Sequence, residues 1–288
     1  MNMNGQCHYE PLGELVDCKH RKAEGYQTYS YHRHDGYEVY LFLSGNVLFY
    51  QNYNCYKLTP GDMLILPPTC MHRIISIDES VYERITINIR HSVIERLSTE
   101  HTNLFTCFES GDTVPIHLDQ SQISTFISLA DRLIESLSNS EYGADIIANS
   151  CLSQLLLIIN KLHLAHNEPK VSIMPELVKN VMLYISDNLA GDLSLTRISE
   201  EFYHNGTYIS RMFKKHTGLT LKEYIIDQRL DMARRYLGHG CNVQEACDKS
   251  GFSDYSNFIR SYTAAYGISP GKARQEAMRK NKNKNKHS

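Results

Sequence analysis

Three histidines and a glutamate are the residues in the first half of the chain whose types and spacing could do chemistry. His32 and His34 lie two positions apart, Glu38 follows closely, and His72 comes from a later segment of similar character. In an extended strand, residues two apart point to the same face, so the imidazoles of His32 and His34 should share one side. Three imidazoles and a carboxylate suit Mn, Fe, Ni or Zn.

The same residues are open to three interpretations: a metal site, the lining of a small-molecule pocket, or histidines that only satisfy buried neighbours. The chain has 19 Tyr and no Trp, and several tyrosines fall between residues 29 and 50. A tyrosine ring with its hydroxyl suits sugars and other polar molecules, although tyrosine is also common in strands. We therefore predict an effector pocket without cofactor or metal, lined by His32, His34, Glu38, His72 and Tyr31. If a metal does bind, its ligands are His32, His34, Glu38 and His72.

A repeat in the last third carries the second candidate chemistry. Residues 211–218 recur in type and spacing at residues 260–267: an Arg, an aromatic residue two positions later, and a Gly five positions after that. Each copy follows a short helical segment and a polar turn. This arrangement predicts two helix-turn-helix units on one body, which suits binding to two neighbouring turns of DNA.

One face of each predicted unit is apolar and should be internal. In the first unit the apolar spacing places Leu195, Ile198 and Phe213 inside. The outward residues are the candidate DNA contacts: Thr207, Ser210, Arg211, Lys214 and Lys215 in the first unit, and Tyr255, Ser256, Asn257 and Arg260 in the second. Arg can pair with guanine and Lys with phosphate. A helical bundle with merely solvated basic residues is the alternative, and the repeat argues against it.

The elements around the histidines are predicted to be short strands over residues 26–90. Residues 39–43 and 63–66 are rich in strand-forming side chains, and residues 84–90 alternate with Ile85, Ile87 and Ile89 on one face. Many short strands at close spacing indicate a sandwich or small barrel.

Helical periodicity follows the strands. Residues 122–137 and 144–164 each carry an apolar stripe, and the second stripe is broad enough to cover the barrel and also meet a second subunit. From residue 176 onward the pattern is helical to about residue 277. Thr220 and Asp254 are expected to cap two of these helices.

Charge divides the chain in the same way. The net charge is −2, but residues 1–171 hold 12 Lys+Arg against 20 Asp+Glu, whereas residues 172–288 hold 18 against 12. The second half is thus the part suited to a polyanion. Eight scattered cysteines without a C-x-x-C pair indicate reduced thiols, and no signal-peptide or membrane-spanning run is apparent, so we expect a cytoplasmic protein that does not enter membranes.

Three segments resemble the arabinose-regulator (AraC/XylS) family of bacterial transcription factors. They are Phe-Lys-Lys-His-Thr-Gly at 213–218, Gly-Phe-Ser-Asp at 251–254 and Tyr-Gly-Ile-Ser-Pro at 266–270. The resemblance covers about residues 176–277. It implies a seven-helix DNA-binding domain with two recognition helices, and sequence-specific promoter binding, commonly as an activator and sometimes as a repressor. We also expect a homodimer, for which the apolar stripe at 144–164 offers the surface, and contact with RNA polymerase. The family often has a basic pair after the aromatic residue in both units. This chain has Lys214-Lys215 in the first but Thr263-Ala264 in the second, so the first unit should supply more of the affinity.

The histidine segment resembles the two sequence motifs of cupin barrels, over about residues 26–90. The matching positions are His32, His34, Glu38 and Gly45, then Gly61, Pro67 and His72, with departures at Thr69 and Ser76. In metal-binding cupins the matching His and Glu positions are the ligands. Regulators of the AraC/XylS family often carry a cupin-like barrel without metal.

Together these patterns predict an α+β multidomain chain: an N-terminal cupin-like β-barrel with added helices, then an all-α domain with two helix-turn-helix units. The predicted boundaries are 1–165 for effector binding and dimerisation, 166–175 for a linker, 176–278 for DNA binding and 279–288 for a disordered basic tail. The chain is predicted to be a non-enzymatic transcriptional regulator that responds to a small-molecule effector such as a sugar. The alternatives are a metal-binding cupin enzyme fused to a DNA-binding module, and a helical interaction module with no DNA role.

Overall fold

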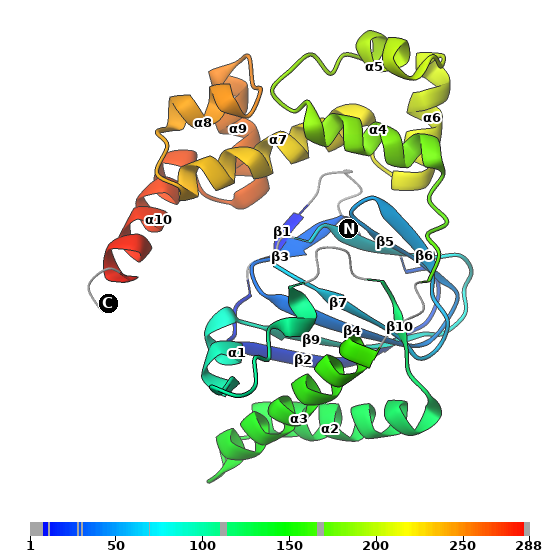
Figure 1. The fold of residues 1–288 in the computed structure, drawn as a ribbon, viewed down its shortest axis with the longest axis vertical. Helices are drawn as coiled ribbons and strands as arrows, with labels where there is room; N and C mark the ends of the chain where they lie inside the picture. Colours follow the sequence, from blue (N-terminus) through cyan, green and yellow to red (C-terminus); the bar gives the residue numbers. More distant parts are fainter. Residues whose placement is uncertain are drawn as a thin grey trace. The chain divides into compact units, whose positions relative to one another are not determined.

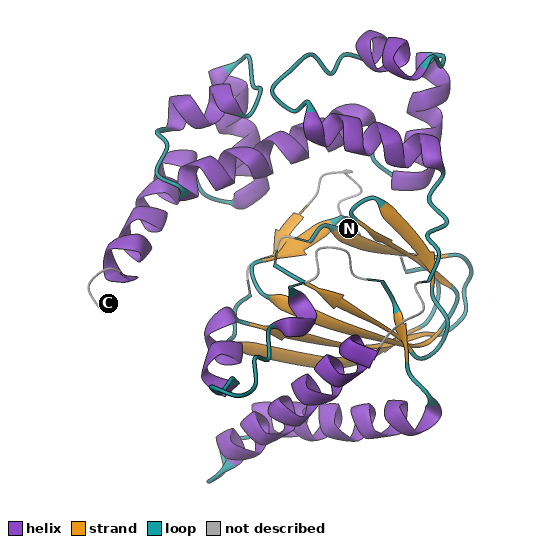
Figure 2. Cartoon of the chain, viewed as in Figure 1, coloured by secondary structure: helices purple, strands orange, loops and turns teal. Residues whose placement is uncertain are grey.

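The chain folds into two compact units, which we call the β domain (Glu10–Ile173) and the helical domain (from Met174, with which residues 8 and 9 are grouped). The structure is a computed structural model and describes residues 8–10, 12–27, 29, 31–68, 70–109, 114–165 and 170–284. A β-sheet domain with added helices precedes an all-helical domain, so the predicted fold class is confirmed (Figures 1 and 2).

Two five-stranded antiparallel sheets form the β domain. The first sheet has the order β1 (His8–Glu10), β3 (His32–His34), β8 (His72–Ser76), β5 (Val47–Gln51) and β6 (Asn54–Lys57). The second has the order β10 (Ile116–His117), β7 (Asp62–Leu66), β4 (Tyr37–Ser44), β9 (Tyr82–Ile89) and β2 (Val16–Ala23). Strands distant in sequence are thus neighbours, and β3 and β8 pair with His32 opposite His72.

Side-chain alternation along β4 and β9 divides the apolar residues between two cores. Tyr40 and Phe42 join an inner cluster with Phe49 of the facing sheet. Ile85 and Ile87 point the other way, into a second cluster shared with helices. Those helices are α1 (His91–Leu97), α2 (Gln120–Ser138) and α3 (Ala144–Ala165), with the short helix η1 (Thr106–Phe108). Figure 1 shows α2 and α3 lying along the sheet that holds β2 and β9.

Helix α3 presents two apolar faces. Leu152 and Ile159 are buried in the core, whereas Ile146, Ile147 and Leu157 are exposed. Only this second set is available to a partner. Among the described helices, α3 alone has the length and hydropathy that a membrane span would need. That is weak evidence for a span, because core helices pass the same test.

The segment after α3 is tied to the edge of the β domain. Ile173 N donates to Cys55 O over 2.8 Å, and Cys55 N donates to Ser172 Oγ over 3.0 Å. Lys170 forms an ion pair with the buried carboxylate of Asp62. Residues 166–169 of the predicted linker lie outside the described residues. Residues 172 and 173 lie beside Cys55 of β6, and the predicted boundaries of the functional domains stay predictions.

The helical domain contains the two predicted pairs of helices. Its elements are α4 (Glu176–Asp187), α5 (Leu195–Phe202), α6 (Gly206–Thr217), α7 (Leu221–Gly238), α8 (Val243–Lys249), α9 (Tyr255–Tyr266) and α10 (Pro270–Lys284). The first unit is α5–α6 and the second is α8–α9, with α7 running between them (Figure 1). The predicted cap at Thr220 is confirmed: its side chain accepts from Glu223 N, and the Glu223 carboxylate accepts from Thr220 N.

Two details of the helical prediction were wrong. Leu195 is 43% exposed, because it lies at the first position of α5, beside the backbone of Gly206. Helix α10 continues to Lys284, so residues 279–284 are helical instead of a disordered tail. Residues 271–284 contain no proline and only one glycine, so nothing in the sequence ends the helix at 278. The rest of the predicted tail, 285–288, lies outside the described residues.

Candidate functional site

The first candidate recognition helix is α6. Asn205 caps it by accepting a hydrogen bond from Thr207 N over 2.9 Å. Ile209 and Phe213 are buried and anchor its inner face. Of the five predicted contacts on α6, four are exposed and Ser210 is half-buried: Thr207, Ser210, Arg211, Lys214 and Lys215. The helix therefore presents its basic side to solvent.

The second candidate recognition helix, α9, is built in the same way. Asp254 caps it by accepting from Asn257 N over 2.8 Å, as predicted. Phe258 and Tyr262 are buried. The four predicted contacts are all exposed: Tyr255, Ser256, Asn257 and Arg260. Both helices end at a glycine with positive φ, 73° at Gly218 and 71° at Gly267, which explains the repeated glycine in physical terms.

The outward faces of α6 and α9 border one hollow of about 1100 Å³. From α6 it is lined by Thr207, Ser210, Arg211 and Lys214, and from α9 by Asn257. Lys215 and Arg260 are exposed but lie outside this lining. The structure thus brings five of the nine predicted contacts to one concave surface.

The two units also touch directly, a contact the sequence analysis missed. Arg229 of α7 donates from Nε to Leu189 O and from Nη2 to Gly191 O, each over 2.9 Å. Gly251, in the turn of the second unit, has φ of 85°, and a Cβ there would lie 2.2 Å from Leu189 O. Only glycine fits this approach. The turn before α5 and the turn before α9 are therefore held in one fixed arrangement.

The last turn of α6 is basic and that of α9 is not. Lys214, Lys215 and His216 end the first helix, whereas the second has no basic residue there. Burial and the adjacent Lys215 lower the pKa of His216, so the two lysines carry the positive charge of this turn near neutral pH. Lysines at the C-terminal end of a helix also interact favourably with its dipole.

The β domain contains a separate cavity of about 440 Å³ between its sheets. Three neighbouring strands of one sheet line it with polar side chains: Asp17, Lys19 and Arg21 of β2, Arg84, Thr86 and Asn88 of β9, and Glu38 and Tyr40 of β4. The facing sheet supplies His32, His34, His72 and Ile74, with Tyr29 beside them. Four of the five predicted pocket residues are in this lining.

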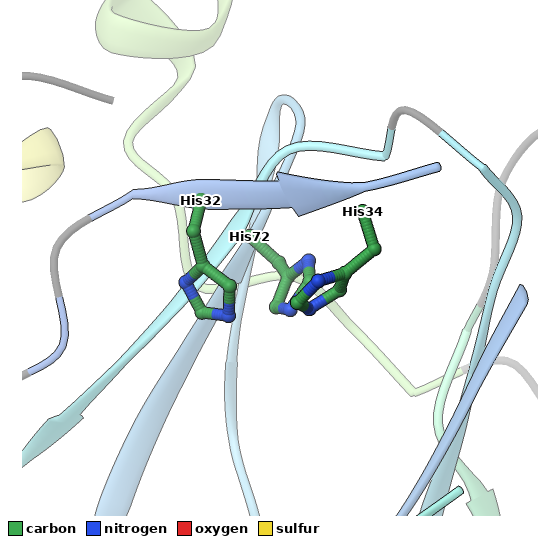
Figure 3. A group of neighbouring side chains, drawn as sticks. All are labelled: His32, His34 and His72. Atoms are coloured by element: carbon green, nitrogen blue, oxygen red, sulfur yellow. The ribbon is translucent and has the colours of Figure 1, made fainter. Parts of the chain in front are cut away.

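The three histidines converge as their spacing predicted. Figure 3 shows His32 and His34 projecting from one strand to the same side, with His72 entering from the neighbouring strand. Ring centroids are 4.3 Å apart for His32 and His72, and 5.5 Å apart for His34 and His72. One ring nitrogen from each residue lies within 4.8 Å of the others. The cluster is compact enough for one small cation or one polar group.

Glu38 links two of these rings. Its Oε2 lies 3.2 Å from His34 Nε2 and 3.1 Å from His72 Nε2. Burial raises the pKa of Glu38, but the charge of His72 and the close approach of both imidazoles outweigh burial and hold the pKa well below its usual range. The carboxylate is therefore ionised within the cavity.

A backbone contact orients His72. Its Nδ1 lies 3.1 Å from Cys70 O, an atom that can only accept, so Nδ1 carries a proton. Nε2 is then the ring nitrogen that faces Glu38. A carbonyl on the far nitrogen is the usual support of a metal-binding histidine, so the residues present fit a divalent metal held by His32, His34 and His72.

Tyr31 does not line the cavity, which corrects that part of the prediction. It is 1% exposed and lies under the guanidinium of Arg73, 4.8 Å from ring centroid to Cζ, with Tyr50 4.6 Å from the same Cζ. Residues next to each other in extended chain point to opposite faces, so Tyr31 cannot share a face with His32. Tyr29 and Tyr40 supply the aromatic lining instead.

The polar side chains of β9 were not among the predicted pocket residues. The alternation of residues 84–90 places the apolar isoleucines on one face, and Arg84, Thr86 and Asn88 occupy the opposite, cavity face. Arg84 and Asn88 are 6% and 8% exposed. The same alternation could have identified them.

Two family models match the chain. Residues 16–156 match an AraC-like ligand binding domain, and residues 198–276 match a helix-turn-helix domain. The first match spans most of the β domain with its cavity, and the second spans α6, α7, α8 and α9.

Curated relatives with similar sequences are regulators. The Msm operon regulatory protein of Streptococcus mutans is 24% identical over 84% of this chain and 85% of its own length. The XylDLEGF operon transcriptional activator 1 of Pseudomonas putida is 22% identical over 92% of this chain and 83% of its own. The HTH-type transcriptional regulator YtdP of Bacillus subtilis is 32% identical over 98 residues, which are 34% of this chain but only 13% of that protein.

Proposed function

Because the chain belongs to the AraC family of transcriptional regulators, we propose that it binds a specific promoter sequence and that a small polar molecule in the β-domain cavity controls this binding. One observation carries the proposal most directly. Two capped helices, α6 and α9, present exposed polar and basic side chains around one hollow.

The family is not one of enzymes, so the alternative of a cupin enzyme fused to a DNA-binding module is set aside. The cavity then serves for binding alone. In our proposal the effector is a molecule such as a sugar, held among His32, His34, Glu38 and His72. No metal is required: treatment with a chelator should leave the response to the effector unchanged, and loss of the response would assign the histidine cluster to a metal instead.

Each recognition helix enters the major groove in this proposal, on successive turns roughly 34 Å apart. On α6, Arg211 contacts a base edge, and Lys214 and Lys215 contact phosphates. On α9 the contacts come from neutral polar side chains and Arg260. The direct contact between the units at Gly251 keeps both helices in register with one face of the duplex.

The effector would act by population shift. A ligand that binds one arrangement of domains or subunits more tightly increases the population of that arrangement and so changes the DNA geometry that the protein can span. Binding at a promoter places the protein in the cytoplasm and next to RNA polymerase, its proposed partner in activation.

A homodimer is part of the proposal, and the exposed apolar face of α3 is its interface. Ile146, Ile147, Leu157 and Leu164 are 69%, 44%, 39% and 70% exposed. Ile147→Glu combined with Leu157→Glu should give monomers in sedimentation velocity. Thr125→Glu combined with Ser128→Glu, at exposed positions of α2, is the control with the same added charge and should remain dimeric. A dimer that survives the double substitution would exclude this interface.

The function is tested by selecting binding sites from random duplex DNA with the full-length protein. We expect a bipartite site whose halves are about 10–10.5 bp apart, and binding that weakens steeply as salt rises. Enrichment of a single short element, or binding insensitive to salt, would contradict the proposal. The selected duplex then serves in gel-shift assays with candidate effectors, where at least one should change the affinity.

A further inference from the structure

Arg84 is a buried cation that lines the β-domain cavity without a complete set of partners. It is 6% exposed. Its Nη2 donates to Tyr29 Oη over 3.1 Å, and its Cζ lies 4.6 Å from the centroid of Tyr82. Nη1 has no hydrogen-bond partner. A buried guanidinium N–H without an acceptor is costly, so an acceptor supplied by a ligand would stabilise this arrangement.

More positive charge faces the same end of the cavity. Arg21 of β2 pairs directly opposite Arg84 in the sheet, and both line the cavity. Like charges directly opposite each other across two strands are destabilising. Neither arginine forms an ion pair with a carboxylate of the described residues. An anion between them would remove the repulsion.

Three carboxylates line the cavity, and two of them are committed elsewhere. Glu38 lies between His34 and His72, and Asp17 forms an ion pair with Lys19. The third, Glu14, is exposed to solvent, which screens its charge. In the register of the sheet, Glu38 and Asp17 both lie opposite Asn88, four residues along β9 from Arg84. The cavity is thus polarised, with carboxylates and histidines at one end and two unpaired arginines at the other.

Asn88 offers a complementary group at the carboxylate end. It is 8% exposed, lines the cavity, and its Oδ1 has no hydrogen-bond partner. An amide oxygen can only accept, so it requires a donor such as a hydroxyl. The unsatisfied atoms therefore specify two features of a ligand, an acceptor at Arg84 and a donor at Asn88.

We propose that the effector is an oxyanion-bearing small molecule, a carboxylate or a phosphate ester with at least one hydroxyl, whose anionic group binds Arg84. Arg21 completes the anion site at the mouth of the cavity, and the hydroxyl donates to Asn88. A planar guanidinium matches the two oxygens of a carboxylate or phosphate. This inference rests on the proposed effector role of the cavity and narrows its ligand from polar molecules in general to anions.

Matched pairs of ligands test the proposal with the wild-type protein. Isothermal titration of the full-length chain would use galacturonate with galactose, glucuronate with glucose, and glucose 6-phosphate. At least one anion should bind about tenfold or more tightly than its neutral partner, as expected for a hydrogen bond to a buried charge. Comparison of the two sugar acids with glucose 6-phosphate shows whether the site prefers a carboxylate or a phosphate group. Equal binding within every pair, or binding by the neutral sugars alone, would overturn the proposal, and so would no binding by any anion.

Substitutions locate the site. Arg84→Gln should weaken the anion about tenfold or more and leave its neutral partner unchanged, and Arg84→Lys should retain part of the preference. Lys22→Gln is the matched control, because Lys22 is on the same strand as Arg21 but outside the cavity lining. Retained anion affinity in Arg84→Gln would overturn the assignment. If that variant does not fold, the titrations of the wild-type protein with matched anionic and neutral ligands still test the proposal.

The same titrations distinguish this inference from the proposed function. If a neutral sugar binds and alters the DNA affinity, the proposed function stands and the proposal of an anionic effector is wrong. If an anion binds through Arg84 without changing the DNA affinity, the proposed ligand class is supported, and the proposed regulatory role of the cavity is wrong.

Discussion

The two helix-turn-helix units share one backbone design and differ in charge. Each recognition helix begins at a capping side chain, Asn205 or Asp254, and ends at a glycine in the left-handed region. Each buries two large apolar residues on its inner face. The last turn of α6, however, is basic, whereas the corresponding positions of α9 are Thr263 and Ala264.

This difference in charge suggests that the two units contribute differently to affinity for DNA and to discrimination between DNA sequences. Contacts from lysine to phosphate supply affinity without regard to sequence, whereas contacts to base edges supply discrimination. The first unit has residues for both, and the second has mainly neutral polar side chains with Arg260. We expect the first unit to hold the protein on DNA and the second to adjust which sites are accepted.

The largest effect should come from breaking the contact between the units. Gly251→Ala places a Cβ 2.2 Å from Leu189 O at a φ of 85°. Strain and collision together should cost roughly 2–4 kcal/mol of folding stability and misplace α9 relative to α6. Bipartite DNA should then be bound no better than a single half-site, as measured by fluorescence anisotropy.

Gly240→Ala is the matched control for that substitution. Gly240 also has a positive φ, 95°, but a Cβ there meets no atom within 4 Å. It should therefore cost only the backbone strain, about 1 kcal/mol, and leave DNA binding intact. If both variants lost bipartite binding equally, the contact at Leu189 would not be what holds the units in register.

The next effect should come from exchanging the basic pair. Lys214→Ala with Lys215→Ala should weaken binding about equally across DNA sequences and reduce the slope of log affinity against log salt by about 2. Thr263→Lys with Ala264→Lys should raise the slope by about as much, because both positions are exposed. Unchanged slopes in both variants would show that these turns do not reach phosphates.

The smallest effect should come from the caps. Asn205→Ala and Asp254→Ala should each lower the free energy of unfolding by about 1 kcal/mol. Asp254 also places a negative charge at a helix N-terminus, which adds about 0.3–1 kcal/mol, and Asp254→Asn isolates this part. Thermal unfolding of the three variants gives the order. A larger loss at Asn205 than at Asp254 would contradict the electrostatic contribution.

The features of the fold and the site that could be predicted from the sequence are those set by residues close together in the chain. The repeated Arg, aromatic and Gly located both recognition helices, and the caps at Thr220 and Asp254 are confirmed. The pair of histidines two apart placed both rings on one face. These successes rest on local geometry, because side-chain direction and cap chemistry are set within a few residues.

The missed features depend on pairing between distant segments. Arg84 enters the cavity opposite Arg21 through a register that joins residues far apart in the chain. Gly251 contacts Leu189 through the packing of two separate turns. Tyr31 was assigned to the pocket by residue type alone, although its position beside His32 already placed it on the other face.

Arginine substitutions in the two recognition helices test the central claim most directly. With the selected duplex, the affinities of Arg211→Ala and Arg260→Ala would be compared with the parent, each on the parent site and on every single base-pair variant. Arg211→Ala should cost about 1–3 kcal/mol and relax preference at one base pair, and Arg260→Ala should cost less. Parent-like binding by Arg211→Ala together with abolished binding by Arg260→Ala would contradict the assignment of the first unit as the stronger one.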